Sequence, residues 1–261
     1  MAPFHIIYKK RNGEYMKNYG FAIKLLGFGL CLIFVFYVFM QSSGAPVSSQ
    51  AVIGLIKECD VTNGMCVLID PGHGGADGGA SSDSGILEKN INLDISQKLY
   101  AVLKTLGIRC EMTRYDDIML DGGASSHKKM HDLKNRVLAS KQYGNCVFVS
   151  IHQNKFPQKK YSGTQVYYSK NDPASETLAK LIQSSVCENL QPENTRQIKK
   201  ATSSIYILDN INCPAVLTEC GFLSNDNEAV KLTEQSYQKQ LACAITAGIV
   251  KFLAVQTAQG E

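Results

Sequence analysis

The sequence predicts a three-layer α/β fold, in which helices flank a mainly parallel, twisted β-sheet, preceded by an N-terminal transmembrane helix. From residue 66 onward, short apolar runs rich in β-branched residues alternate with longer amphipathic segments. Several of these runs are uniformly apolar, which is typical of strands buried on both faces of a parallel sheet. Near the N-terminus, a basic segment is followed by an unbroken apolar run, which is typical of a membrane span.

The 261-residue chain begins with a basic segment, 1–24, that is expected to lie in the cytoplasm. Residues 25–41 are almost continuously apolar and, with the residues just before them, reach the roughly 20 residues that a bilayer crossing needs. No basic residue follows before Lys57, so the charge asymmetry predicts an uncleaved signal anchor, in a single-pass cell-membrane protein whose remainder is extracytoplasmic. The alternative is a cleaved signal peptide and a secreted protein, because 43–45 is a small-residue run suited to cleavage.

Residues 42–65 are expected to be a linker, since they begin with small polar residues and a proline, and 66–255 to form one domain. The net charge is only +4 and the basic residues are scattered, so no nucleic-acid partner is expected. The nine cysteines include no CxxC pair, which argues against a structural zinc knuckle. Most lie in or beside apolar runs, where cysteine packs as a small hydrophobic residue.

The first strand of the domain is predicted at 66–69 and stops at the Asp-Pro-Gly turn, 70–72. The glycine-rich loop that follows contains His73. Residues 88–106 place apolar side chains on one helical face, so they are predicted to form a helix. Its first residue, Glu88, also suits the helix dipole, which is a purely structural explanation for an acid there.

The remaining elements follow from the same patterns of apolar spacing. Further strands are predicted at 108–113, 145–151, 163–168, 204–208 and 215–218. Further helices are predicted at 130–142, 175–190 and 235–253. Because strands and helices alternate, most of the strands are expected to run parallel.

Three predicted strands end in a residue that can bind a metal or move a proton: His73, His152 and Glu219. The carboxyl ends of parallel strands share one edge of a sheet, so these side chains can meet, and Glu88 can reach the same edge. Two histidines, one carboxylate and an open position form the usual catalytic zinc site. The remaining carboxylate would then act as general base on a zinc-activated water. This pattern alone does not decide which glutamate is the ligand.

Other candidate sites are weaker. His127 and His131 have the helical spacing of a metal-binding pair but lack an adjacent acid. Cys220 could be a nucleophile with His152 as its base, although its place at the end of a buried strand favours packing. The glycine loop is not followed by Gly-Lys-Ser/Thr, so it is not a phosphate-binding loop.

Four motifs, in this order, resemble those of the zinc-dependent N-acetylmuramoyl-L-alanine amidases, the family often called Amidase_3. The motifs are Asp70-Pro-Gly-His-Gly-Gly-x-Asp-x-Gly-Ala80, Gly85-x-x-Glu88-Lys-x-x-Asn92-Leu, Ser150-Ile-His152-x-Asn154 and Glu219-x-Gly-Phe-Leu-Ser-Asn225. The resemblance extends from about Cys66 to Leu253. It implies hydrolysis of the amide that joins N-acetylmuramic acid to the L-alanine of the peptidoglycan stem.

The resemblance also implies roles for individual residues. The positions that match the family's zinc ligands are His73, Glu88 and His152. The catalytic carboxylate falls on Glu219, which separates the two glutamates. Asn154 and Arg114 are expected to contact the substrate, whereas Arg136 is expected to tie a loop to the sheet.

A compact catalytic domain behind an N-terminal anchor resembles the germination-specific branch of this family, which makes muramic-δ-lactam in the cortex of bacterial spores. Clostridial members of that branch work with a lipoprotein, so a lipoprotein activator is a hypothesis for this chain. Two other classes stay open: a different zinc peptidoglycan hydrolase, such as a carboxypeptidase or endopeptidase, and a non-catalytic wall-binding protein. The presence of all four key residues disfavours the second class.

Overall fold

The computed structural model describes residues 64–259. The predicted basic segment 1–24, the predicted anchor 25–41 and most of the predicted linker 42–65 therefore lie outside the described residues. At the centre of the described domain is a six-stranded sheet with the strand order β2-β1-β3-β6-β4-β5. The predicted α/β class is confirmed.

The strands are β1 (Cys66–Pro71), β2 (Cys110–Met112), β3 (Cys146–Asn154), β4 (Gln165–Tyr168), β5 (Lys199–Lys200) and β6 (Ala215–Phe222). The helices are α3 (Glu88–Thr105), α4 (Lys128–Gln142), α5 (Ala174–Asn189), α6 (Tyr206–Asn210), α7 (Asp226–Lys231) and α8 (Gln235–Gln259).

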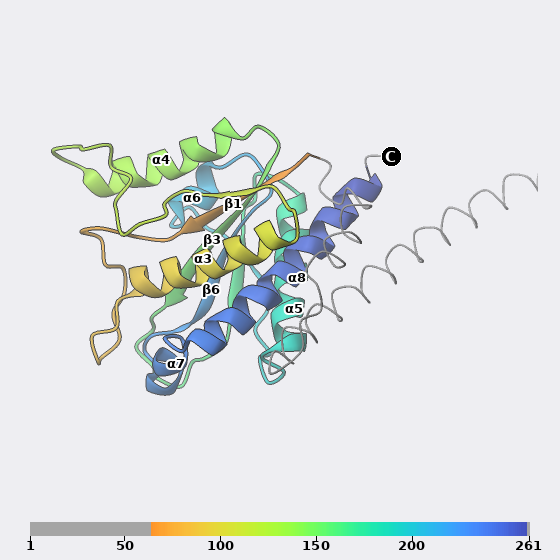
Figure 1. Ribbon diagram of the computed structural model, residues 1–261. Helices are drawn as coiled ribbons and strands as arrows, with labels where there is room; N and C mark the ends of the chain where they lie inside the picture. Colours follow the sequence, from red (N-terminus) through yellow and green to blue (C-terminus); the bar gives the residue numbers. More distant parts are fainter. Residues whose placement is uncertain (1–63, 260–261) are drawn as a thin grey trace, which may run out of the picture. The chain divides into compact units, whose positions relative to one another are not determined.

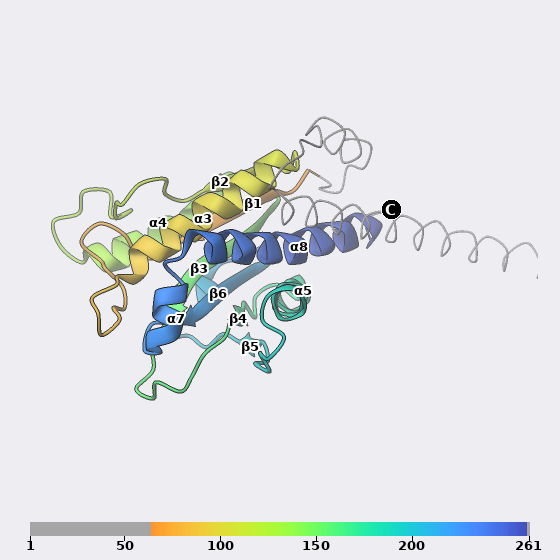
Figure 2. The ribbon, with the colours of Figure 1, turned by 60° about the horizontal axis from the view of Figure 1, so that its bottom comes forward.

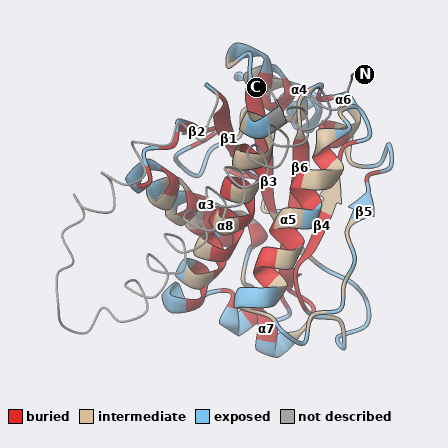
Figure 3. Cartoon of the chain, turned by 90° about the vertical axis from the view of Figure 1, so that its right-hand side faces the viewer, coloured by how far each residue is buried: buried red, intermediate tan, exposed pale blue. Residues whose placement is uncertain are grey.

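The sheet is mixed rather than wholly parallel. β2, β1, β3 and β6 run parallel to one another, whereas β4 pairs antiparallel with β6. No helix lies between β3 and β4, so the chain enters β4 at the edge where it left β3 and must run back. The middle strands are buried, and all six residues of β1 are inaccessible (Figure 3). This explains why β1, β3 and β6 each begin with a run of apolar residues.

Helices cover both faces of the sheet (Figure 1). On one face, α8 lies between α3 and α5 (Figure 2). Gly248 of α8 allows a close approach to α5, because a Cβ there would lie 2.5 Å from Ile182 Cα. Among the described residues, only Gln235–Ala258 is long and apolar enough to cross a membrane. Leu241 and Ile245 of that segment are fully buried in the domain, so α8 is its core helix.

The opposite face carries a second apolar core beneath α4 and α6. Strand residues Leu68 and Phe148 pack there against Val137 of α4 and against Ile207 and Leu208 of α6. This arrangement overturns the strand predicted at 204–208, where α6 occupies the second half. An apolar run this short does not distinguish a strand from a helix, and Ile207 and Leu208 are both buried in the helix that forms instead.

The two elements that the sequence did not predict are short. β5 consists of two exposed lysines at the sheet edge and carries no apolar signal. The six-residue α7 begins after Asn225, whose side chain accepts a hydrogen bond from the Glu228 backbone N–H at 3.0 Å. The other predicted strands and helices are present near their predicted positions.

Candidate metal centre and active site

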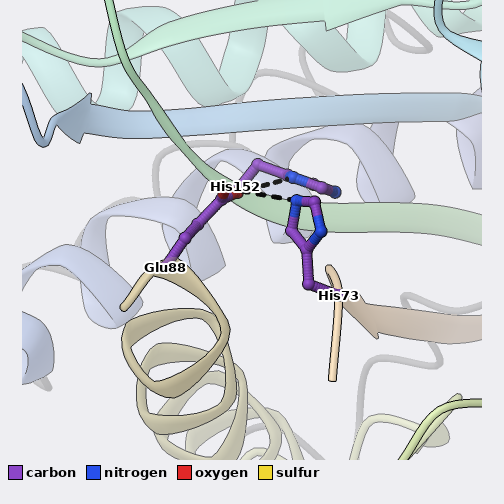
Figure 4. A group of neighbouring side chains, drawn as sticks. All are labelled: His73, Glu88 and His152. Carbon is purple, nitrogen blue, oxygen red and sulfur yellow. Dashed lines mark hydrogen bonds and ion pairs between the residues drawn. The ribbon is translucent and has the colours of Figure 1, made fainter. Parts of the chain in front are cut away.

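His73, Glu88 and His152 meet at the carboxyl edge of the sheet. His73 follows β1, His152 lies in β3, and Glu88 is the first residue of α3. One ligand atom from each side chain lies within 4.8 Å of the other two, and the three side chains point toward one another (Figure 4). Within residues 64–259, no other group of this kind is found, so His127 and His131 form no such cluster.

Glu88 contacts both histidines of this group. Its Oε1 lies 2.8 Å from His152 Nδ1, and its Oε2 lies 3.2 Å from His73 Nε2. Backbone N–H groups of Gln153 and Ala80 donate to the same two oxygens at 3.1 and 2.8 Å. Burial alone would raise the pKa of Glu88, but the two histidines outweigh it and hold the pKa far below its ordinary value. Glu88 is therefore a carboxylate at neutral pH.

Two glycines make room for this group. A Cβ on Gly72 would lie 2.2 Å from His152 Nε2, so the imidazole rests directly on the glycine backbone. A Cβ on Gly79 would lie 2.5 Å from Glu88 Oε2 and 2.7 Å from His73 Cδ2. His73 itself has φ of +61°, an unusual conformation for a residue with a side chain. The glycine-rich loop thus has the shape that brings the three side chains together.

His73 is held from both sides of its ring. Its Nδ1 lies 2.8 Å from Asp77 Oδ2, and Lys129 Nζ donates to the same carboxylate oxygen. Burial would lower the pKa of His73, but Asp77 and Glu88 together raise it to about 9. Neither Asp77 nor Lys129 was predicted as a site residue. The available signal was the position of Asp77, four residues after His73 in the same loop.

Glu219 stands beside this group on β6. It is the register partner of His152 on the neighbouring strand, so both side chains emerge on the same face of the sheet. Glu219 Oε2 is buried and has no hydrogen-bond partner among the described residues. Burial, reinforced by the nearby charge of Glu88, raises the pKa of Glu219 to about 8. The site therefore contains one ionised and one readily protonated carboxyl group.

Arg114 is buried among the loops that surround the site. Its side chain is 2% exposed, and its Nε and Nη2 donate to the carbonyls of Pro71 and Gly72 at 3.0 Å each. Two further donor contacts reach the carbonyls of Asp116 and Lys89. Contact between Arg114 and substrate stays a prediction, and these bonds favour a structural role.

Arg136 occupies the position expected of a structural arginine. It is 1% exposed, and its Nη1 donates to Asp70 Oδ1 at 2.6 Å. Its Nη2 donates to the carbonyl oxygen of His73, also at 2.6 Å. Arg136 thus ties the loop that contains His73 to the sheet. Asn154 ends β3 at the same edge and is partly exposed, and its substrate contact stays a prediction.

Cys220 is fully buried, and burial raises the pKa of its thiol. A buried, protonated thiol is a poor nucleophile, so the cysteine-nucleophile alternative is wrong.

The donor atoms of the site fit a metal ion. Two imidazole nitrogens and one carboxylate form a ligand set that suits zinc and related divalent metals. The adjacent Glu219 Oε2, buried without a hydrogen-bond partner among the described residues, is a polar group that a solvent molecule or substrate at this site could satisfy. The group His73, Glu88 and His152 could therefore hold a metal ion beside a carboxyl group suited to proton transfer.

Comparisons with known proteins agree with this site. The family model described as N-acetylmuramoyl-L-alanine amidase matches residues 67–251. The germination-specific N-acetylmuramoyl-L-alanine amidase of Bacillus subtilis is 36% identical over 193 residues, which cover 73% of this chain and 80% of that protein.

The CwlD amidase of Clostridioides difficile, solved in complex with the GerS lipoprotein, has a TM-score of 0.69 and 39% identity, covering 73% of this chain and 99% of that one. The catalytic domain of the CwlV amidase from Bacillus (Paenibacillus) polymyxa has a TM-score of 0.62 and 30% identity, with 73% and 99% coverage. The chain therefore belongs to the N-acetylmuramoyl-L-alanine amidase family.

Proposed function

We propose that this protein is a zinc-dependent hydrolase that cleaves the amide between N-acetylmuramic acid and L-alanine in peptidoglycan. The observation that carries the proposal is the convergence of His73, Glu88 and His152 beside Glu219, whose Oε2 is buried. Family membership supplies the substrate class, and the two-histidine, one-carboxylate set favours zinc as the metal.

A zinc ion held by these three residues would supply Lewis-acid polarisation of the lactoyl amide carbonyl and of the attacking water. Glu219 is the group proposed to move the proton. It would accept a proton from the attacking water and deliver it to the departing alanine nitrogen, so the products are a lactoyl carboxylate and a free amine. A nearby divalent cation lowers the pKa of a carboxyl group, which would bring Glu219 into its basic form at neutral pH.

Glu219→Gln tests this role in the full-length chain. Removal of the proton-transfer group should lower turnover about 10²- to 10⁴-fold while zinc content stays at the wild-type level. The measurement is release of stem peptides with free L-alanine N-termini from purified cell walls, quantified by mass spectrometry. Glu188→Gln, a change at an exposed glutamate, serves as the control. Near-normal turnover of Glu219→Gln would overturn the assignment.

The same product analysis separates the competing functions. A carboxypeptidase or endopeptidase would shorten the stem without releasing L-alanine amino termini from muramic acid. A wall-binding protein without activity would retain its affinity for the wall and release no peptide. His73→Ala should lose both zinc and activity, since it removes a ligand rather than the proposed base.

We further propose spore cortex peptidoglycan as the substrate and a lipoprotein as a partner. The support is the similarity to the germination-specific amidase and to the amidase solved with a lipoprotein. Initial cleavage rates on cortex and vegetative walls, each measured with and without a co-purified lipoprotein, test both parts. Equal rates on the two walls would contradict the cortex assignment.

We also propose that the apolar run 25–41 anchors the protein in the cell membrane and that the catalytic domain lies outside the cytoplasm. The basic residues before the run and their absence directly after it support this orientation. Protease added to intact cells should remove the domain, and alkaline washing of membranes should leave the full chain bound. Complete release of the chain into the medium would instead support cleavage near 43–45.

A further inference from the structure

The imidazole of His73 has a carboxylate on each ring nitrogen. Nε2 faces Glu88 Oε2 at 3.2 Å, within the group that could hold the metal. Nδ1, on the other side of the ring, faces Asp77 Oδ2 at 2.8 Å. Asp77 therefore lies behind the ligand rather than among the ligands. A carboxylate in this position fixes the tautomer and the orientation of a metal-binding histidine and increases its basicity.

Asp77 is itself held in place by hydrogen bonds with three residues. Its backbone forms two hydrogen bonds with Gly74, Asp77 N–H to Gly74 O at 3.0 Å and Gly74 N–H to Asp77 O at 2.9 Å. Its Oδ1 accepts a hydrogen bond from the Gly79 backbone N–H at 3.2 Å. Lys129, in the first turn of α4, donates to Oδ2, and its Nζ lies 3.4 Å from His73 Nδ1. The carboxylate thus has a fixed position next to an imidazole whose backbone is also constrained.

We propose that Asp77, held by Lys129, is the positioning residue that presents His73 Nε2 to the metal. This inference rests on the proposed zinc site and assigns roles to two residues outside the ligand set. Asp77 accepts a hydrogen bond from Nδ1–H, so the lone pair of His73 lies on Nε2, toward Glu88 and the other ligand. Lys129 keeps the charge of Asp77 compensated and links α4 to the metal-binding loop.

A purely structural explanation would make Asp77 a residue that only shapes the glycine loop. Asp117 offers a matched control, because it holds the same loop without touching a ligand. Its Oδ1 accepts a hydrogen bond from the Gly75 N–H at 2.7 Å, and its Oδ2 pairs with Lys89 Nζ at 2.6 Å. If loop shape alone mattered, loss of either aspartate would have a similar effect.

The experiment measures zinc affinity of the full-length, metal-free chain by competition with a chromophoric chelator. Asp77→Ala should weaken zinc binding about 10- to 100-fold, the usual effect of losing a carboxylate behind a metal-binding histidine. Asp77→Asn should lose less, since its amide oxygen still accepts a hydrogen bond from Nδ1–H. Lys129→Met should lose less than Asp77→Ala, and Asp117→Ala should bind zinc as the wild type does.

Thermal unfolding in the presence of a chelator shows whether each metal-free variant is folded, and Asp77→Asn keeps the test valid if Asp77→Ala does not fold. Wild-type zinc affinity in both Asp77 variants, or a loss in Asp117→Ala equal to that in Asp77→Ala, would overturn the positioning role alone. Failure of the wild-type chain to bind zinc would overturn the proposed function and this inference with it.

Discussion

Gly72 supports the imidazole of His152 so closely that no side chain fits between them. Its φ is not in the left-handed region, so an alanine is tolerated by the backbone and opposed only by the 2.2 Å contact that its Cβ would make with His152 Nε2. Space for a ligand, rather than backbone freedom, is therefore what this glycine supplies.

We expect Gly72→Ala to displace His152 and to weaken zinc binding about 10-fold or more, because the ligand must leave its position against Glu88. Gly78→Ala is the control in the same loop, since its Cβ would make an ordinary 3.6 Å contact with Leu87. Zinc titration of both variants checks the prediction. Equal affinities for the two would show that His152 tolerates the added methyl group.

The sequence indicated four candidate residues, because each stands at the end of a buried strand or at the start of a helix, and the family resemblance then separated the predicted ligand Glu88 from the predicted base Glu219. It did not identify Asp77 or Lys129. Lys129 belongs to a helix that begins 50 or so residues further along, and only the folded loop brings it to the ring. A side-chain contact between an irregular loop and a distant helix has no period in the sequence from which it could be inferred.

At the scale of elements, α7 is attached to the carboxyl edge of the sheet by its buried residue Glu228. Glu228 Oε1 accepts a hydrogen bond from the Gly163 N–H, and Oε2 accepts one from the Phe222 N–H, both at 2.8 Å. The side chain thus joins the loop before β4 to the end of β6, only three residues after Glu219. This short helix therefore contributes both to the stability of the fold and to the position of the β6 end that carries Glu219.

Glu228→Ala should lower the free energy of unfolding by about 2–4 kcal/mol, since it leaves two buried backbone donors without an acceptor. Asp226→Ala, in the same helix, removes only an exposed ion pair with Lys159 and should cost less than about 1 kcal/mol. Urea denaturation of both variants tests the difference. Comparable losses would indicate that the helix end, not the buried carboxylate, stabilises this edge.

The elements themselves were predictable wherever a long periodic pattern meets a buried surface, as in α3 and α8. The prediction was wrong at 204–208, because the apolar residues of α6 are few and cover a second core on the far side of the sheet. The antiparallel direction of β4 also has no local signal. The direction of β4 depends on the edge of the sheet at which β3 ends, because the chain enters β4 from that edge.

At the scale of the whole molecule, a buried ionic network joins the sheet to α4. Asp70 accepts hydrogen bonds from Arg136, Thr113 and Ser150 at 2.6, 2.6 and 2.7 Å, and Arg136 also pairs with Asp132. Burial alone would raise the pKa of Asp70, but the charge of Arg136 and the two hydroxyl groups outweigh it and lower the pKa. Folding therefore favours the ionised carboxylate.

This shift makes the stability of the domain depend on pH. An acid whose pKa is lower in the folded state contributes its full stability above its unfolded pKa, about 3.9 for aspartate, and loses it as the pH falls through the folded pKa. We expect the free energy of unfolding to decline below about pH 4 in urea titrations. Asp70→Asn should be about 3 kcal/mol less stable at pH 7 and should lose less on acidification. A wild-type stability that stays constant down to pH 3 would contradict this expectation.

His152 and Glu219 are partners in the register of β3 and β6. Sliding one of these strands by a single residue would send the Glu219 carboxyl to the far face, away from both imidazoles. Activity therefore requires the correct register of β3 and β6. A newly made chain that has collapsed without aligning these two strands contains every reactive group but cannot hydrolyse peptidoglycan.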